Sequence, residues 1–225
     1  MMYKIDTHVH TKFGSPCAQT TAARTVELYA EAGYDALVIT NHYHPIIMEQ
    51  IWAGRTYQER VKKFLYGYYA ATECAKKYNM TIILGMEINF PGYPNDYLLY
   101  GFDEEFVYSH PDMYRLGIKR FKEEIVDKDS RLLLVHAHPY RESTVPSDAS
   151  LLHGIEVFNG NVRHENHNDK AICLAKENGL FMLSGSDFHE EEDAGRGGIK
   201  TNVLPKDSFA FADLIRSGKY ELITK

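Results

Sequence analysis

The sequence predicts an α/β fold, and three observations support this. Apolar runs of strand type alternate with helical segments along the whole chain. The runs are continuously apolar, as at residues 36–40, which is typical of parallel sheets that are buried on both faces. Polar residues with metal-binding or acid–base side chains stand at the ends of these runs. A barrel and a doubly wound sheet agree equally well with the first two observations.

The first half of the chain predicts three strands and two helices. Thr20 or Thr21 provides an N-cap for the first helix, and Gly33 provides its C-terminal stop. The third strand ends in an acid, Glu87. In order, the expected elements are a strand at 3–6, a helix at 22–32, a strand at 36–40, a helix at 57–78 and a strand at 81–87.

The second half continues the alternation. Gly179 is the expected stop of one helix, and Asp207 or Ser208 caps the last one. The irregular stretches 43–54 and 91–95 are expected to form long loops over one face. The expected elements are strands at 97–102, 131–136, 154–159 and 180–183, and helices at 112–127, 168–178 and 207–217.

Length and composition exclude several classes of protein. The chain has 225 residues, with 44% hydrophobic and 25% charged, so we expect a single domain over residues 1–225. No apolar run approaches the about 18 residues of a membrane-spanning helix. The N-terminus has no signal-peptide pattern, and three widely spaced cysteines make no disulfide framework. We therefore expect a reduced, cytoplasmic protein with no membrane partner.

The charge pattern counts against one class of partner, and the histidines are not scattered. The formal net charge is −6, and no basic stripe stands out, which counts against a broad nucleic-acid interface. A pocket for one phosphate remains compatible with this balance. The 11 histidines are grouped, and close pairs occur at 8 and 10, 42 and 44, 136 and 138, and 164 and 167.

Polar residues at the strand ends favour a barrel. In an α/β barrel, the active site is built at the C-terminal rim by the ends of several strands. An open sheet instead gathers its site at one switch point. Here six strand ends supply such residues: His8 and His10, Asn41 and His42, Glu87, His136 and His138, Asn159, and Asp187 with His189. The sequence therefore predicts a closed or nearly closed barrel.

The same residues indicate a metal centre. His8 and His10 point to one side of an extended segment, because side chains alternate along a strand. Glu87 needs either a metal or a basic partner, since an unpaired buried charge is costly. Nitrogen and oxygen ligands without a cysteine set suit Zn, Mn or Fe. The candidates exceed the needs of one four-coordinate ion, so we expect two or three divalent ions.

Six segments taken together resemble one family. They are Asp6-Thr7-His8-Val9-His10-Thr11, Ile39-Thr40-Asn41-His42, Gly85-Met86-Glu87, His136-Ala137-His138-Pro139, Gly154-Ile155-Glu156-Val157-Phe158-Asn159 and Gly185-Ser186-Asp187-Phe188-His189. In order and spacing the chain resembles the PHP (polymerase and histidinol phosphatase) superfamily over roughly residues 3–205. The resemblance implies a distorted (β/α)7 TIM-like barrel of seven parallel strands and a site that commonly holds three metals.

The resemblance assigns ligands to each metal. The first ion would be held by His8, His10, Glu87 and Asp187, the second by Glu87, His138 and His110, and the third by His42 and His189. The family normally adds an Asp or His where this chain has Ser15 and Pro16. Either Cys17 supplies a thiolate there, or the third site is weak or built differently. Asn41 replaces a frequent Asp, which affects metal tuning more than binding.

The implied activity is hydrolysis of a phosphate ester. We expect a small phosphomonoester, similar to histidinol phosphate or a nucleotide, attacked by a metal-bridging hydroxide. Alternatives are a phosphodiesterase or exonuclease on short oligonucleotides, a protein-tyrosine phosphatase and a non-catalytic module. Asp187, His42 and His189 are the expected catalytic residues, and an active-site histidine protonates the leaving group.

The sequence also offers candidates for phosphate recognition. Arginine matches the geometry of phosphate better than lysine. The expected substrate-binding residues are Arg141, Arg163, Arg196 and Asn159. His44 and His136 are extra to the family pattern, and each is either an orienting or phosphate-facing residue or a solvated histidine. The sequence leaves the oligomeric state open.

Overall fold

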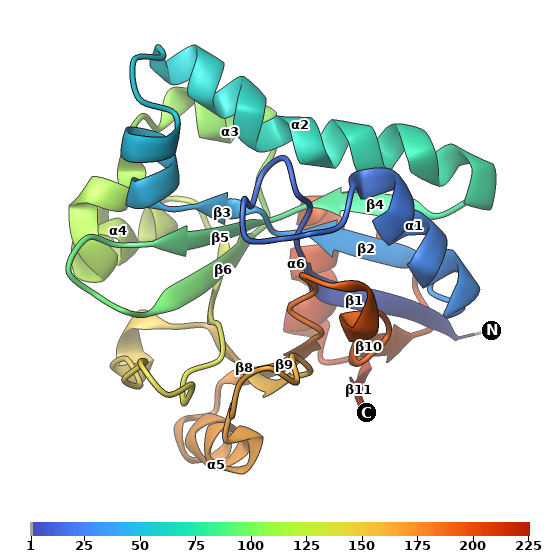
Figure 1. Cartoon of the computed structure of the whole chain (residues 1–225). Helices are drawn as coiled ribbons and strands as arrows, with labels where there is room; N and C mark the ends of the chain where they lie inside the picture. The colour runs from blue at the N-terminus through green and yellow to red at the C-terminus, as the bar shows by residue number, and fades with distance from the viewer. Residues whose placement is uncertain (1) are drawn as a thin grey trace.

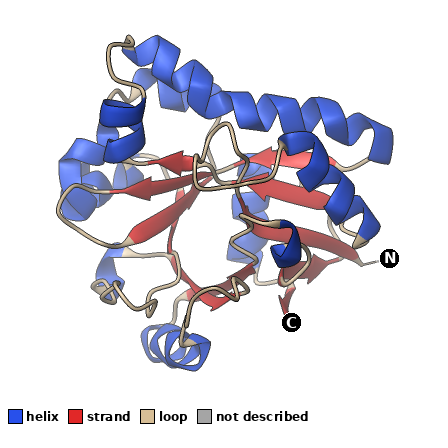
Figure 2. Cartoon of the chain, viewed as in Figure 1, coloured by secondary structure: helices blue, strands red, loops and turns tan. Residues whose placement is uncertain are grey.

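Two β-sheets form the centre of the molecule, and helices lie around them (Figures 1 and 2). The computed structural model describes residues 2–225. The strands are β1 Tyr3–Val9, β2 Ala36–Ile39, β3 His42–Tyr43, β4 Thr81–Leu84, β5 Met86–Asn89, β6 Asp96–Tyr100, β7 Leu133–His136, β8 Gly154–Asn159, β9 Phe181–Gly185, β10 Gly197–Thr201 and β11 Glu221–Thr224. The α-helices are α1 Ala22–Glu31, α2 Tyr57–Ala75, α3 Glu104–Ser109, α4 Gly117–Glu124, α5 Asn168–Asn178 and α6 Ser208–Ser217.

The strand directions are mixed, so the expectation of purely parallel strands is wrong. One sheet has the order β11-β10-β1-β2-β4, and the other has the order β3-β5-β6-β7-β8-β9. Strand β6 runs antiparallel to both β5 and β7, and β10 runs antiparallel to both β1 and β11. The remaining pairs are parallel. A mixed α/β fold is confirmed.

The two sheets meet along two seams. At one seam the chain passes from β2 to β3 through Thr40 and Asn41, and from β4 to β5 through Gly85. At the other, β1 lies against β9, where the Thr7 hydroxyl donates to the Ser184 carbonyl over 2.8 Å. No closed sheet forms within residues 2–225, and the seven-stranded barrel stays a prediction.

Both sheets contribute to one apolar core. Ile5 from β1, Val38 from β2 and Val135 from β7 belong to the same buried cluster, which Phe211 of α6 also joins. Two further clusters pack the outer helices onto the sheets: α1 and α2 on one side, and the helical segments from α3 to α5 on the other. Helix α2 crosses the top of the molecule in Figure 1, and α5 lies at the bottom.

Several element boundaries differ from those expected. The helix predicted at 112–127 is reduced to α4, with 3₁₀ turns at Met113–Leu116 and Val126–Lys128. Asp112 has a left-handed backbone (φ 53°), which cannot belong to a right-handed helix. The predicted loop 43–54 contains a π-helical turn, Ile46–Ile51. Strands β10 and β11 and helix α3 were not among the expected elements.

The helices have no membrane-spanning character. In the part of the chain that the structure describes, no helix has the length and apolarity needed to cross a membrane. The cytoplasmic location and the single domain over residues 1–225 stay predictions.

Candidate metal centre

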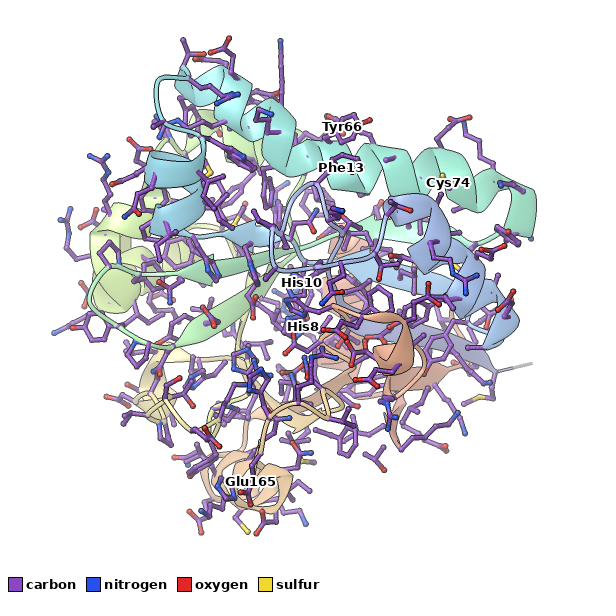
Figure 3. The ribbon with its side chains drawn as sticks, viewed as in Figure 1. His8, His10, Phe13, Tyr66, Cys74 and Glu165 are labelled. Atoms are coloured by element: carbon purple, nitrogen blue, oxygen red, sulfur yellow. The ribbon has the colours of Figure 1, made fainter. Side chains whose placement is uncertain are left out.

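The strand ends bring the ligand candidates to one rim of the sheets. His8 lies on β1 and Glu87 lies on β5, paired in register with His42 of β3. His138 lies two residues after the end of β7. Asp187 lies two residues after the end of β9. Figure 3 shows His8 and His10 in the interior, between the two sheets.

Four side chains converge on one buried point. The Nε2 atoms of His8 and His10 lie 2.9 Å apart. Glu87 Oε1 lies 3.2 Å from His8 Nε2, and Asp187 Oδ1 lies 3.4 Å from His10 Nε2. All four side chains are almost completely buried. This is the first ligand set expected from the family resemblance, and the structure brings all four members together.

The hydrogen bonds on the far side of each imidazole leave these nitrogens bare. His8 Nδ1 lies 2.9 Å from Glu156 Oε1, so Nδ1 carries the proton and donates to the carboxylate. His10 Nδ1 lies 3.0 Å from the Ser15 hydroxyl, which donates to Asn41 Oδ1 and can therefore accept a proton from His10 in the same tautomer. Two lone pairs and two carboxylates then face one another in a buried space. Such an arrangement needs a cation, so the donor set fits a divalent metal.

Electrostatic coupling keeps the two carboxylates ionised. Burial would raise the pKa of Glu87, but electrostatic interactions with His8 and His42 and hydrogen bonds with His138 and His42 hold it well below its usual range. Burial likewise would raise the pKa of Asp187, but Arg141 and His8 hold it well below. Ionised carboxylates are the form that binds metals.

A second group of side chains also includes Glu87. His138 Nε2 lies 3.2 Å from Glu87 Oε1, and Asp96 Oδ2 lies 3.8 Å from His138 Nε2. His44 Nε2 lies 3.3 Å from Asp96 Oδ1 and 4.0 Å from Glu87 Oε2. Glu87, Asp96 and His138 could hold one ion together. Glu87 is thereby shared between two groups, as a bridging carboxylate would be.

His110 lies elsewhere, which corrects its expected place in the second group. It ends α3, and its Nδ1 donates to the Phe106 carbonyl over 2.8 Å. Its ring packs on Phe106 with the ring centroids 4.4 Å apart. Asp96 takes the position expected for His110.

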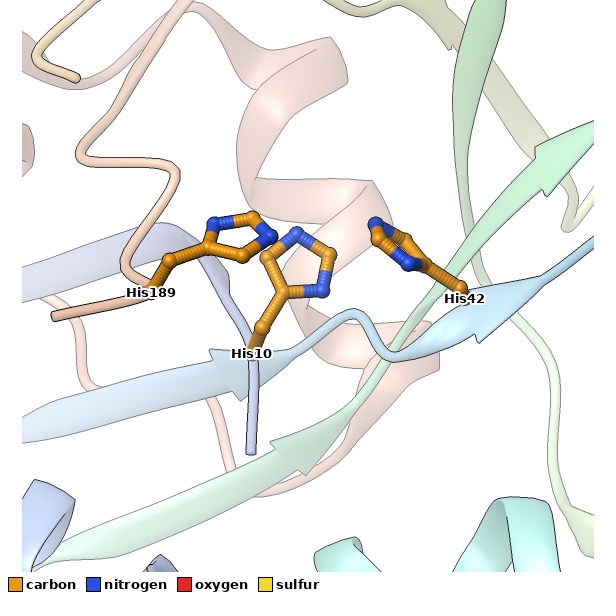
Figure 4. A group of neighbouring side chains, drawn as sticks. All are labelled: His10, His42 and His189. Carbon is orange, nitrogen blue, oxygen red and sulfur yellow. The ribbon is translucent and has the colours of Figure 1, made fainter. Parts of the chain in front are cut away.

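A third group consists of three histidines. The rings of His10, His42 and His189 lie close together (Figure 4), with centroids 4.4 Å apart for His10 with either neighbour. Cys17 Sγ lies 3.5 Å from His42 Nδ1. Burial raises the pKa of the Cys17 thiol, but hydrogen bonds with His189 and His42 lower it more, to about 6. A thiolate therefore stands beside this group.

Ser15 has a different role from a ligand. Its hydroxyl contacts His10 Nδ1 and accepts from the His42 backbone amide, each over 3.0 Å. Asn41 Oδ1 in turn accepts from the Thr11 amide over 2.9 Å. Ser15 thus orients His10, and Cys17 is the side chain of this loop that reaches the cavity.

Glu156 is a site residue that sequence reasoning did not assign. It is fully buried on β8, and Oε1 accepts from His8. Its Oε2 accepts from the His138 amide over 3.0 Å and from Asn159 Nδ2 over 2.9 Å. Gly185 makes this possible, because a Cβ there would lie 2.4 Å from His8 Cβ. Glu156 therefore orients ligand candidates of two groups.

Among the expected phosphate-binding residues, Arg141 has the strongest link to the site. Its Nη2 contacts Asp187 Oδ2 at 2.5 Å and Asn159 Oδ1 at 3.2 Å. Arg163 also lines the cavity, but Asp193 holds its guanidinium in two hydrogen bonds of 2.9 and 2.6 Å. Arg196 donates to the Glu192 carbonyl and does not line the cavity. Asn159 is buried and positions Arg141.

The cavity at the centre is small. Its volume is about 280 Å³, and His164 and Glu190 belong to its wall together with the ligand candidates. His136 is not part of it. That ring is buried and stacks on Tyr97 at 5.0 Å, and burial and then His138 lower its pKa to about 3. His136 is therefore a neutral core histidine, not a solvated one.

Two ligand candidates have unusual backbone conformations. His138 (φ 30°) and Asp187 (φ 52°) both lie in the left-handed region, two residues after the ends of β7 and β9. Residues other than glycine adopt this region at an energetic cost, and such strain concentrates at functional sites. From these positions the His138 side chain contacts Glu87, and the Asp187 side chain contacts His8 and His10.

The sequence matches one family model. The model describes the PHP domain and matches residues 6–189. No curated protein sequence matches the chain.

Solved structures share the fold at low sequence identity. One is a two-domain protein from Bacteroides vulgatus containing a predicted PHP-like metal-dependent phosphoesterase: 19% identity, TM-score 0.66, covering 100% of this chain and 65% of that one. PsfC from Pseudomonas syringae has 16% identity and a TM-score of 0.66, covering 100% of this chain and 92% of PsfC. The lesion-specific endonuclease PfuEndoQ from Pyrococcus furiosus has 15% identity and a TM-score of 0.61, covering 99% of this chain and 58% of the endonuclease. This chain therefore spans less than two thirds of the Bacteroides protein.

Proposed function

The chain belongs to the PHP domain family, and from this premise we propose that it is a metal-dependent phosphoesterase that hydrolyses a small phosphomonoester. The family match confirms the resemblance carried by the histidine and acid motifs. The observation that carries the proposal is the convergence of His8, His10, Glu87 and Asp187 on one buried point, with bare imidazole nitrogens facing two carboxylates.

The residues present fit two or three divalent ions of the Zn, Mn or Fe type. His8, His10, Glu87 and Asp187 would hold the first, and Glu87, Asp96 and His138 the second. His42 and His189 would hold the third with Cys17. Bound there, the ions supply a nucleophile at neutral pH and stabilise charge on phosphoryl oxygens.

The chain's own side chains bind the phosphate and move the proton. Arg141 would rotate one N–H from Asp187 to a phosphate oxygen while Asn159 and Asn166 hold its other donors. The ring nitrogens of His42 and His189 would bind the third ion, so these two side chains are poorly suited to donate a proton to the leaving group. His164 belongs to no candidate metal group and lies on the cavity wall. We therefore assign His164 the delivery of a proton to the leaving oxygen.

The size and charge of the cavity support a small substrate. About 280 Å³ accommodates a phosphate with little beside it. Glu190 on the wall and Glu191 and Glu192 next to it would repel a long polyanion. These features favour a phosphomonoester over an oligonucleotide, although one solved structure with a similar fold, PfuEndoQ, is an endonuclease.

We also propose that the two sheets act as the family's distorted barrel. The apolar cluster shared by β1, β2, β4, β6, β7, β9 and β10 would be its interior. The backbone hydrogen bond from His10 to the Phe188 carbonyl, 3.1 Å long, links the segment after β1 to the segment after β9 at one seam between the sheets.

The test is phosphate release by protein loaded with Mn²⁺ or Zn²⁺, measured over a panel of small phosphomonoesters. Asp187→Asn should lower kcat/KM by more than about 100-fold, since loss of an outer partner alone costs 10–100-fold. Asp213→Asn, at an exposed position on α6, is the matched control and should keep full activity. Release by Asp187→Asn at the level of the native protein, or none by the native protein on any ester, would refute the proposal.

A further inference from the structure

A second cavity adjoins the metal centre and shares His44 with it. Its volume is about 460 Å³, and it lies between the turn Ile46–Ile51 and the hairpin loop that joins β5 to β6. That loop is at the left of Figure 1. We propose that this cavity, the side pocket, binds the leaving group of the substrate, and that the substrate is the phosphate monoester of a neutral aromatic or similarly apolar alcohol. The inference rests on the proposed function and deepens it.

The side pocket has an uncharged, apolar lining. Its lining residues are His44, Pro45, Ile46, Asn89, Pro91, Gly92, Tyr93 and Pro94, with no lysine, arginine or acid among them. Ile46 is 60% exposed and Tyr93 55% exposed, so two large apolar side chains face water there. Covering them with an apolar group is favourable. A leaving group that carried further phosphates or a charged amine would find no partner among these residues.

The side pocket is fixed relative to the phosphate position. The His44 ring stacks on the His42 ring, with centroids 4.2 Å apart and an interplanar angle of 18°. Asn89 Nδ2 donates to the Tyr93 carbonyl over 3.2 Å and to Asp96 Oδ1 over 3.1 Å. One asparagine thus ties the hairpin loop to the second metal group. A substrate that spans both cavities would meet a largely preformed surface, which lowers the entropy cost of binding.

The two cavities divide the substrate between them. The metal centre, with its four carboxylates and Arg141, takes the charged phosphate. The side pocket takes an apolar body, because its lining offers aromatic and proline surface and few donors. His44 forms the common wall, so the ester oxygen would lie beside it.

Non-hydrolysable phosphonates test this directly, because they separate binding from chemistry. The dissociation constants of methylphosphonate and benzylphosphonate are measured by calorimetry on the metal-loaded protein. We expect benzylphosphonate to bind at least about tenfold more tightly, the scale for burying extra apolar groups in a pocket. Ile46→Asp should reduce this preference to about onefold. Ile51→Asp is the matched control, since Ile51 is 50% exposed on the same turn but does not line the side pocket.

Each outcome has a distinct meaning. A preference for benzylphosphonate that Ile46→Asp removes and Ile51→Asp retains supports the side pocket. Equal binding of the two phosphonates by the native protein, or equal loss in both variants, overturns the inference but leaves the phosphoesterase proposal standing. Binding of neither phosphonate, together with no phosphate release from any ester, overturns the proposed function and this inference with it.

Discussion

Glu156 is a single buried residue that contacts members of two candidate metal groups. Its two oxygens accept from His8 Nδ1 and from the His138 backbone amide. Glu156→Gln keeps the shape, but its amide NH₂ cannot accept the proton of His8 or of His138, depending on its orientation. We expect metal affinity to fall by about 10–100-fold, as for other groups that orient metal ligands.

Metal titration with a competing chelator measures this change. The control is Glu124→Gln, at an exposed position of α4 paired with Arg120. Unchanged metal affinity in Glu156→Gln would show that His8 needs no orienting carboxylate.

The ligand set of the third group depends on whether the Cys17 thiolate binds the ion. Its Sγ lies beside His42 Nδ1, and Cys17 directly follows Ser15 and Pro16, the positions where the resemblance would place an Asp or His. If the thiolate binds, cobalt-substituted protein should show sulfur-to-cobalt charge-transfer absorption in the near ultraviolet. We expect Cys17→Ser to remove that absorption and one bound ion per chain.

Cys173→Ser is the control for Cys17, because Cys173 is also exposed but lies on α5. An identical cobalt spectrum in native protein and Cys17→Ser would exclude the thiolate ligand. Activity need not be measured for this result.

The predicted ligands that the structure brings together are those that stand in a recognisable motif. His8 and His10, Glu87, His138 and Asp187 were named from motif spacing, and the structure brings them together. Asp96 was not predicted as a ligand because no recognisable motif surrounds it. His110 is the sole histidine between Glu87 and His136, which is why the sequence suggests it as a ligand. The sequence does not show that His110 ends α3 and lies away from the second group. Glu156 was within a motif, but its contact with His8 depends on packing.

At the level of elements, Gly67 determines how closely helix α2 can pack against the loop before Ser15. A Cβ at Gly67 would lie 2.1 Å from Thr11 Oγ1 and 2.5 Å from Asn41 Nδ2. Alanine is the better helix former by about 1 kcal/mol, so propensity alone predicts stabilisation. We expect the opposite, a loss of roughly 1–2 kcal/mol, because overpacking outweighs propensity.

Urea unfolding of Gly67→Ala measures the loss, and a metal titration checks whether the displaced loop weakens the third group. Lys63→Ala is the control, at an exposed position of the same helix. Stability equal to or above that of the native protein would show that α2 and the loop can separate without cost.

The parallel strands were easier to predict from the sequence than the antiparallel ones. The buried apolar runs correctly predicted β2, β4, β7 and β8, whose residues are buried on both faces. Strand β6 was expected, but its antiparallel direction was not. Because it runs in reverse, its first residue, Asp96, lies at the rim that the other strands reach with their last residues. Strands β10 and β11 carry few apolar residues and gave no such signal.

For the whole molecule, metal and fold should be coupled. The groups at the rim come from β1, β3, β5, β6, β7 and β9, so bound ions would connect both sheets. A ligand that binds only the folded state stabilises it by mass action.

The overall architecture was predictable because the alternation of strands and helices extends through the chain. The division into two sheets was not, because it depends on bends at Thr40 and Gly85 that carry no clear sequence signal.

Elemental analysis of protein purified without chelator tests the central claim most directly. The account predicts two or three ions of Zn, Mn or Fe per chain, and at least one fewer in Asp187→Ala with the fold retained by circular dichroism. Fewer than one ion per chain in the native protein, even after incubation with each metal, would contradict it.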